Sequence, residues 1–82
     1  MAEITYDIKE NVGVISENAR GWTKELNLVV WNDHAAKYDI REWNPEHNRM
    51  SKGLTFTAEE LGVLRSLLEK LDLPMENLPE ED

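Results

Sequence analysis

The segment KYDIREW, residues 37–43, places two cations and a tryptophan at alternate positions. Successive side chains of a β-strand point to opposite faces, so we expect Lys37, Arg41 and Trp43 to share one face of a sheet. Trp31 ends the preceding apolar segment, and the same alternation puts it on the more polar face of that segment. Indole rings can stack on nucleic-acid bases, while Lys and Arg side chains neutralise phosphates. These residue types in this pattern are suited to holding a single strand of nucleic acid.

A second interpretation of this aromatic and basic face stays open from the residues alone. In it, the tryptophans pack on the aliphatic stems of Lys and Arg or complete the rim of the core. Asp39 lies between Lys37 and Arg41 on the same face, where we expect its carboxylate to orient Arg41. Because that carboxylate keeps the positive field local, we expect poor affinity for long duplex DNA.

A polar segment at residues 44–53 adds two more cations, Arg49 and Lys52, in what we expect to be a flexible loop. Lys52 and the following Gly53 could bring an ammonium group and a backbone amide to one phosphate. An ordinary solvated loop is the more usual explanation of the same residues. The spacing of a loop that binds nucleotide triphosphates is absent from the sequence.

The sequence contains two histidines, His34 and His47, each beside an acidic residue. Neither belongs to a metal-ligand or nucleophile motif, and we expect both to be solvent-exposed turn residues. We therefore predict no catalytic residue, no metal ligand, no cofactor and no enzymatic activity.

The composition indicates one small domain of 82 residues, whose thin core would gain much from a partner. Without cysteine the chain has no disulfide and no thiolate zinc site, and no segment resembles a signal peptide or could span a bilayer. We expect a cytoplasmic protein with no membrane partner. The net charge of −8 opposes a polyanionic partner overall, but residues 20–52 carry six cations against five acids, whereas residues 53–82 carry two against eight.

The apolar pattern predicts four short antiparallel strands in a meander, at residues 4–10, 12–17, 24–31 and 36–43. Asn11 is expected to turn the chain between the first two, and residues 18–21 and 32–35 to make the other turns. Residues 74–82 contain two prolines and an acidic end, so we expect a flexible tail after a folded domain at 1–73.

A helix is predicted after the polar loop, because Thr57 and Glu60 have the spacing of a capping box. Four leucines follow at steps of three and four residues and form one apolar stripe: Leu61, Leu64, Leu68 and Leu71. Packing on one face of the sheet explains part of this stripe, but its width exceeds what that packing requires. We therefore predict that the helix also meets its own copy in a homodimer.

The segments DIREW at 39–43 and KGLTFTAEEL at 52–61, with the leucine-rich helix after them, resemble the positive cofactor four family. These are single-stranded-DNA-binding domains of transcriptional coactivators, and this chain is similar to a short bacterial member over roughly residues 3–71. The resemblance implies an α+β fold with a four-stranded curved antiparallel sheet, one C-terminal helix and a homodimer formed through the helices. It also implies that single-stranded DNA binds across the concave sheet face with little sequence preference. The residues that match the family's binding positions are Trp31, Arg41, Trp43 and Lys52.

Two departures limit what the resemblance implies. The hairpin NDH at 32–34 lacks the basic residues of eukaryotic members, and the chain has no serine- and lysine-rich N-terminal region, so a coactivator role is not transferred. We predict a non-enzymatic homodimer that binds single-stranded DNA, or RNA, in transcription, replication or repair. The alternative is a protein-interaction module that uses the same sheet face. The predicted stacking residues are Trp22, Trp31 and Trp43, and the predicted phosphate contacts are Lys24, Lys37, Arg41, Arg49 and Lys52.

Overall fold

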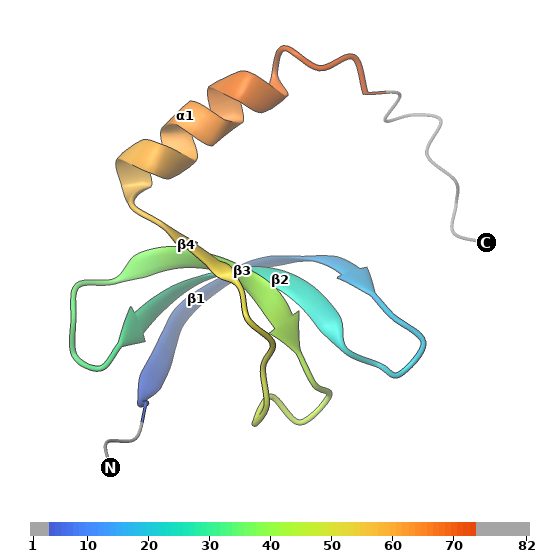
Figure 1. The fold of residues 1–82 in the computed structure, drawn as a ribbon, viewed down its shortest axis with the longest axis vertical. Helices are drawn as coiled ribbons and strands as arrows, with labels where there is room; N and C mark the ends of the chain where they lie inside the picture. The colour runs from blue at the N-terminus through green and yellow to red at the C-terminus, as the bar shows by residue number, and fades with distance from the viewer. Residues whose placement is uncertain (1–3, 74–82) are drawn as a thin grey trace.

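The fold is an open antiparallel sheet followed by one helix (Figure 1). The computed structural model describes residues 4–73, so the tail predicted at 74–82 lies outside the described residues. The strands pair in chain order, β1-β2-β3-β4, which confirms the predicted α+β class and the meander. The elements are β1 (Tyr6–Glu17), β2 (Thr23–Trp31), β3 (Lys37–Trp43), β4 (Leu54–Phe56) and α1 (Ala58–Leu68).

Strand β1 is continuous over twelve residues, so the predicted turn at Asn11 is wrong. Three register shifts along β1 absorb the extra residues while it stays paired with β2, as β-bulges do. The Asn11 side chain remains in the sheet because its amide nitrogen donates to Asn27 Oδ1 at 2.6 Å and to Glu25 Oε1 at 3.3 Å. Polar partners on β2 therefore hold Asn11 within the strand, where the sequence suggested a turn.

Strand β4 follows the polar loop and was not predicted as a strand. Its three residues pair with Tyr38–Ile40 of β3. Gly53 makes this close approach possible, because a Cβ at that position would overlap Arg41 Cβ and the carbonyl oxygen of Ile40. The fourth strand therefore comes after the loop rather than before it.

Helix α1 begins with the predicted capping box. Glu60 N donates to Thr57 Oγ1 at 3.0 Å, and Thr57 N donates to Glu60 Oε1 at 2.9 Å. Beyond its first turn the helix stands away from the sheet, and none of its residues is buried (Figure 1). The expectation that this helix covers the sheet within one chain is therefore not met.

The buried apolar side chains in residues 4–73 are Val29 and Trp43 alone. Large apolar side chains remain exposed on both the sheet and the helix, including Val14 in β1 and Leu67 in α1. So small a core is unusual for a stable domain, since burial of apolar area supplies most of the driving force for folding. No described helix has both the length and the apolar character needed to cross a membrane.

Candidate nucleic-acid interface

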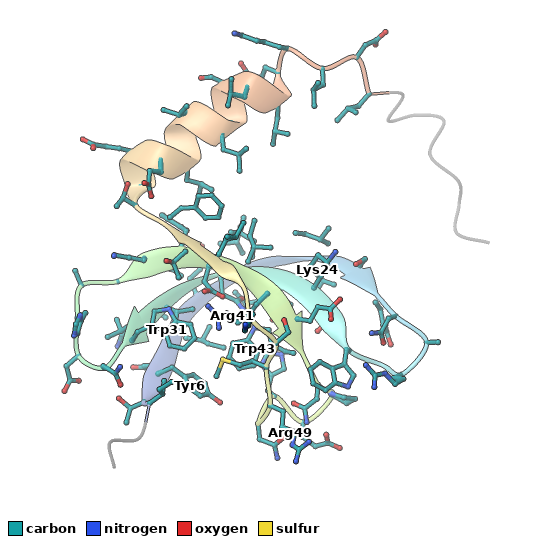
Figure 2. All side chains as sticks on the ribbon, viewed as in Figure 1. Tyr6, Lys24, Trp31, Arg41, Trp43 and Arg49 are labelled. Atoms are coloured by element: carbon teal, nitrogen blue, oxygen red, sulfur yellow. The ribbon has the colours of Figure 1, made fainter. Side chains whose placement is uncertain are left out.

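The strand register gathers four of the eight candidate side chains, Trp31, Lys37, Arg41 and Trp43, on the face of the sheet opposite the helix. Figure 2 shows Tyr6, Trp31, Arg41 and Trp43 on that side, where the loop of residues 44–53 also lies. Directly paired residues of antiparallel strands share a face, so the register assigns the rest of this surface. We call it the loop-side face, and it comprises Thr23, Glu25, Asn27, Val29 and Trp31 of β2 and Lys37, Asp39, Arg41 and Trp43 of β3.

A buried ion pair fixes Arg41 at the centre of this face. Nε and Nη2 of Arg41 each donate to one carboxylate oxygen of Asp39 at 2.7 Å. The Asp39 side chain is fully buried and the Arg41 side chain is 14% exposed. This two-bond geometry is the strong form of the Arg–carboxylate pair, and it confirms that Asp39 orients Arg41.

Arg41 also joins β3 to its neighbours. Its guanidinium carbon lies 4.5 Å from the centroid of the Trp31 ring, within range of a cation–π contact. Its Nη1 donates to the carbonyl oxygen of Ser51 at 3.3 Å, which ties the end of the loop to the sheet. A depression opens at this point, lined by Ile4, Trp31, Asn32, Arg41, Met50, Ser51 and Lys52.

Trp43 lies beneath the loop and exposes none of its surface. The Tyr6 ring packs against it with centroids 5.3 Å apart, and the His47 ring stacks on it at 5.0 Å with planes 5° apart. The expectation that Trp43 offers an open indole face is therefore wrong, because protein side chains already occupy the space beside it. Its match to the family's aromatic position is consistent with a supporting place under the site.

His47 holds the loop to the sheet while 40% of its side chain stays exposed, so the predicted solvent exposure holds only in part. Its Nε2 lies 2.9 Å from Glu25 Oε2, and its backbone carbonyl accepts a hydrogen bond from the Tyr6 hydroxyl at 3.1 Å. Its backbone is left-handed, with φ of 61°, which an ordinary residue adopts only when its surroundings demand it. The other histidine, His34, is exposed as expected.

Glu25 is the buried acid that receives these contacts, with an exposed fraction of 3%. Burial alone would raise the pKa of its carboxyl group, but hydrogen bonds from Thr23, Asn27 and His47 and the charge of His47 outweigh it. The pKa of Glu25 is therefore held below its ordinary value of 4.5. An ionised carboxylate is the stable form in this network.

Asn44 organises the loop that carries the remaining cations, so the segment is better ordered than the sequence suggested. Its side-chain oxygen accepts from the backbone nitrogens of Asn48 and Arg49, both at 2.9 Å. Its side-chain nitrogen donates to Asn48 Oδ1 at 2.7 Å and to Glu46 Oε1 at 3.1 Å. Asn44 is 8% exposed, and this set of bonds gives the loop one shape.

The structure brings together three of the eight predicted binding residues, Trp31, Arg41 and Lys52, in one depression. The others lie elsewhere. Lys24 pairs in register with Glu42 on the helix side of the sheet (Figure 2), and Trp22 precedes β2 at the opposite end of that strand. The remaining two cations are exposed: Lys37 lies on the loop-side face at the start of β3 but outside the depression, and Arg49 lies on the loop.

Sequence reasoning missed the uncharged lining of the depression. Asn32 has a positive φ of 51° in the hairpin after β2, and Ser51 Oγ accepts from Glu42 N at 3.0 Å. The signal for Asn32 was its place beside Trp31 in a tight turn, where Asn tolerates positive φ. Within residues 4–73, no group of three or more His, Asp or Glu side chains is placed to hold a metal ion.

An open antiparallel sheet with a Trp–Arg–Lys depression on one face is typical of a domain that binds single-stranded nucleic acid. The family Transcriptional Coactivator p15 (PC4) matches residues 18–67, a range that holds β2, β3, the loop, β4 and most of α1. An uncharacterized protein of Treponema pallidum (strain Nichols) is 41% identical over 68 residues, which is 83% of this chain and 80% of that protein. This chain belongs to the Transcriptional Coactivator p15 (PC4) family, which confirms the resemblance inferred from its motifs.

Membership carries a general function. The family binds nucleic acid, single-stranded DNA in particular, has transcription-related roles and is not a family of enzymes. It does not by itself assign the binding face or the oligomeric state of this chain, which depend on the residues described above.

Proposed function

We propose that the protein is a homodimer that binds single-stranded DNA with little sequence preference through the depression at Trp31, Arg41 and Lys52. The observation that carries this proposal is that β2, β3 and the loop end converge there, bringing together residues far apart in sequence. An aromatic ring beside a planar cation and an ammonium group suits one base and its phosphate, and stacking tolerates any base.

The three residues have different roles in this proposal. Trp31 is half-buried and supplies the stacking surface, while Arg41 holds its ring and is itself neutralised by Asp39. Lys52 is exposed, and no described acid lies within 4.0 Å of its ammonium, so its charge remains for a phosphate. Stacking therefore dominates the affinity and Lys52 adds the salt-dependent part.

The homodimer is supported by the apolar surface that one chain leaves uncovered. Leu54 of β4 and Val63 of α1 are 66% and 60% exposed, and Leu67 is 50% exposed. Together with Phe56, Leu64 and neighbouring side chains they line a mostly apolar hollow along the helix. A second copy covers equivalent surfaces at once, and the interface would include the predicted residues Leu61, Leu64, Leu68 and Leu71.

Fluorescence-anisotropy titration of a labelled single-stranded oligonucleotide, its duplex and an RNA equivalent, at low and moderate salt, tests the binding. We expect preference for the single strand over the duplex and affinity that falls with added salt. Trp31→Ala should weaken binding about 5- to 150-fold, which corresponds to one stacked base. Lys52→Ala tests the salt-dependent part of the affinity. Its matched control is Lys70→Ala, which removes a cation from the exposed turn after α1.

Binding that does not respond to salt or to Trp31→Ala would contradict the proposal and favour a polypeptide partner on the same face. Sedimentation equilibrium tests the dimer separately. We expect twice the chain mass of 9.5 kDa, and Leu64→Asp with Leu67→Asp should shift the species toward one chain mass. A monomeric wild-type protein at tens of micromolar would overturn that part.

A further inference from the structure

The hairpin between β1 and β2 carries a tryptophan and an arginine that the depression at Trp31 does not use. The guanidinium carbon of Arg20 lies 5.6 Å from the centroid of the Trp22 ring, within the range of a cation–π contact. Arg20 is exposed and Trp22 is half-buried. An indole and a planar cation are thus paired at the surface, as they are at Trp31 and Arg41.

This hairpin is held in one shape before any ligand arrives. Asn18 N donates to the Trp22 carbonyl at 2.8 Å, and Asn18 Oδ1 accepts from the backbone nitrogens of Arg20 at 2.9 Å and Trp22 at 3.0 Å. Gly21 completes the turn with φ of 85°, a conformation that favours glycine. A ligand that binds here therefore orders little additional backbone, which favours affinity.

The β1–β2 hairpin lies against the loop of residues 44–53, which covers the loop-side face. A Cβ added to Gly21 would lie 3.1 Å from Pro45 Cγ, so the two turns are in contact range. Pro45 follows Asn44, whose backbone nitrogen donates to the carbonyl of Arg49 at 3.1 Å. The exposed Arg49 therefore belongs to the same corner of the molecule and adds a second cation to it.

The two tryptophans lie at opposite ends of β2. The β1–β2 and β2–β3 hairpins stand at opposite ends of the sheet in Figure 1. Nine residue steps separate Trp22 from Trp31, which at ~3.4 Å per step corresponds to about 30 Å along the strand. A single nucleotide cannot reach both rings, but an oligonucleotide can.

We infer that Trp22 and Arg20 form a second nucleobase-binding site, so that one protomer holds a single DNA strand at both ends of β2. This inference rests on the proposed function, because the first site is the depression at Trp31. The acids Glu17 and Glu46 lie on the same hairpin and loop, so the site binds through stacking on the ring more than through net charge. Occupying both sites raises affinity through effective concentration once the strand spans them.

A length series of labelled thymidine oligonucleotides, from about 4 to about 16 nucleotides, tests the second site by anisotropy. The wild-type protein is compared with Trp22→Ala, Trp22→Phe and the charge control Lys70→Ala. With the longest strand we expect Trp22→Ala to bind about 5- to 150-fold more weakly, and Trp22→Phe to recover most of that loss. With the shortest strand we expect less than a twofold change, since the depression at Trp31 still binds it.

The outcomes separate this inference from the proposed function. If the wild-type protein binds long strands and Trp22→Ala binds every length as tightly as the wild-type protein does, the inferred second site is wrong while the proposed function stands. A loss that is the same at every length would also overturn it, because it would indicate damage to the fold, which thermal unfolding of the variant would reveal. If the wild-type protein binds no strand of any length, the proposed function itself fails.

Discussion

Replacing Asp39 by asparagine should destabilise the protein far more than one lost charge at a surface would. The Asp39 side chain is fully buried and accepts both of its 2.7 Å hydrogen bonds from Arg41, whose side chain is 14% exposed. Removing one partner of a buried pair leaves the other charge uncompensated, at a cost of about 3–5 kcal/mol. Because Arg41 keeps its contacts with Ser51 and Trp31, we expect the lower end of that range.

A loss of about 3 kcal/mol lowers the melting temperature of a domain this size by about 12–24 °C. Tryptophan fluorescence during thermal unfolding measures it, at one fixed protein concentration because a dimer's stability depends on concentration. Asp7→Asn is the matched control. Asp7 pairs with Lys9 at 2.8 Å, but both side chains are more than half exposed, so we expect a change below about 1 kcal/mol. If Asp39→Asn melts no lower than Asp7→Asn, the buried pair does not stabilise this face.

Three further perturbations test the contacts around the site. Gly53→Ala should destabilise by about 1–3 kcal/mol, measured by urea unfolding, because the added Cβ overlaps Arg41 and the Ile40 carbonyl; an unchanged midpoint would contradict this. Burial opposes ionisation of Glu25, but hydrogen bonds outweigh it and hold the pKa of the folded protein's Glu25 below 4.5. The ionised carboxylate therefore stabilises the fold fully above pH 4.5, and this stabilisation is lost as the pH falls through the pKa that Glu25 has in the folded protein. Glu25→Gln should therefore lose stability less steeply than the wild-type protein as the pH falls below 4.5 in an acid titration, and parallel curves would rule the contribution out. Lys52→Ala should reduce the slope of log affinity against log salt by about 0.7, and an unchanged slope would mean that Lys52 contacts no phosphate.

The alternation of side chains in β2 and β3 was sufficient to predict which residues share a face. Because strand period is fixed at two, Asp39 and Arg41 had to lie on one face, and the Asp39–Arg41 pair followed from their spacing. The capping box at Thr57 was equally local and equally predictable. Features that depend on residues within four positions of one another were thus recovered from the sequence.

Contacts between residues far apart in the sequence were not predictable in the same way. Alternation gives the face of Trp43 but not what covers it, and the covering loop is attached by His47, which reaches Glu25 across 22 positions of sequence. Strand β4 was missed because three residues are too few for a period to show, and Asn11 was misread because its partners lie on another strand. The tertiary partner, not the local propensity, decided each of these positions.

Gly62 offers a direct test of how the dimer forms. A glycine inside a helix costs roughly 1 kcal/mol relative to alanine, and within this chain a Cβ at Gly62 would meet nothing within 4 Å. Gly62 nevertheless lines the hollow between helix and sheet that also contains Leu26, Tyr38 and Leu61. If a second copy fills this hollow, the absence of a side chain at Gly62 lets the partner approach closely.

We therefore expect Gly62→Ala to weaken the dimer by about tenfold or more in sedimentation equilibrium, even though alanine favours the helix. Ser66→Ala, at an exposed position of the same helix, is the control and should leave the dissociation constant within about twofold. The opposite result, a Gly62→Ala protein that is more stable and equally dimeric, would show that the partner does not pack against this turn. The dimer would then have to be built on the outer hollow at Val63 and Leu67 alone.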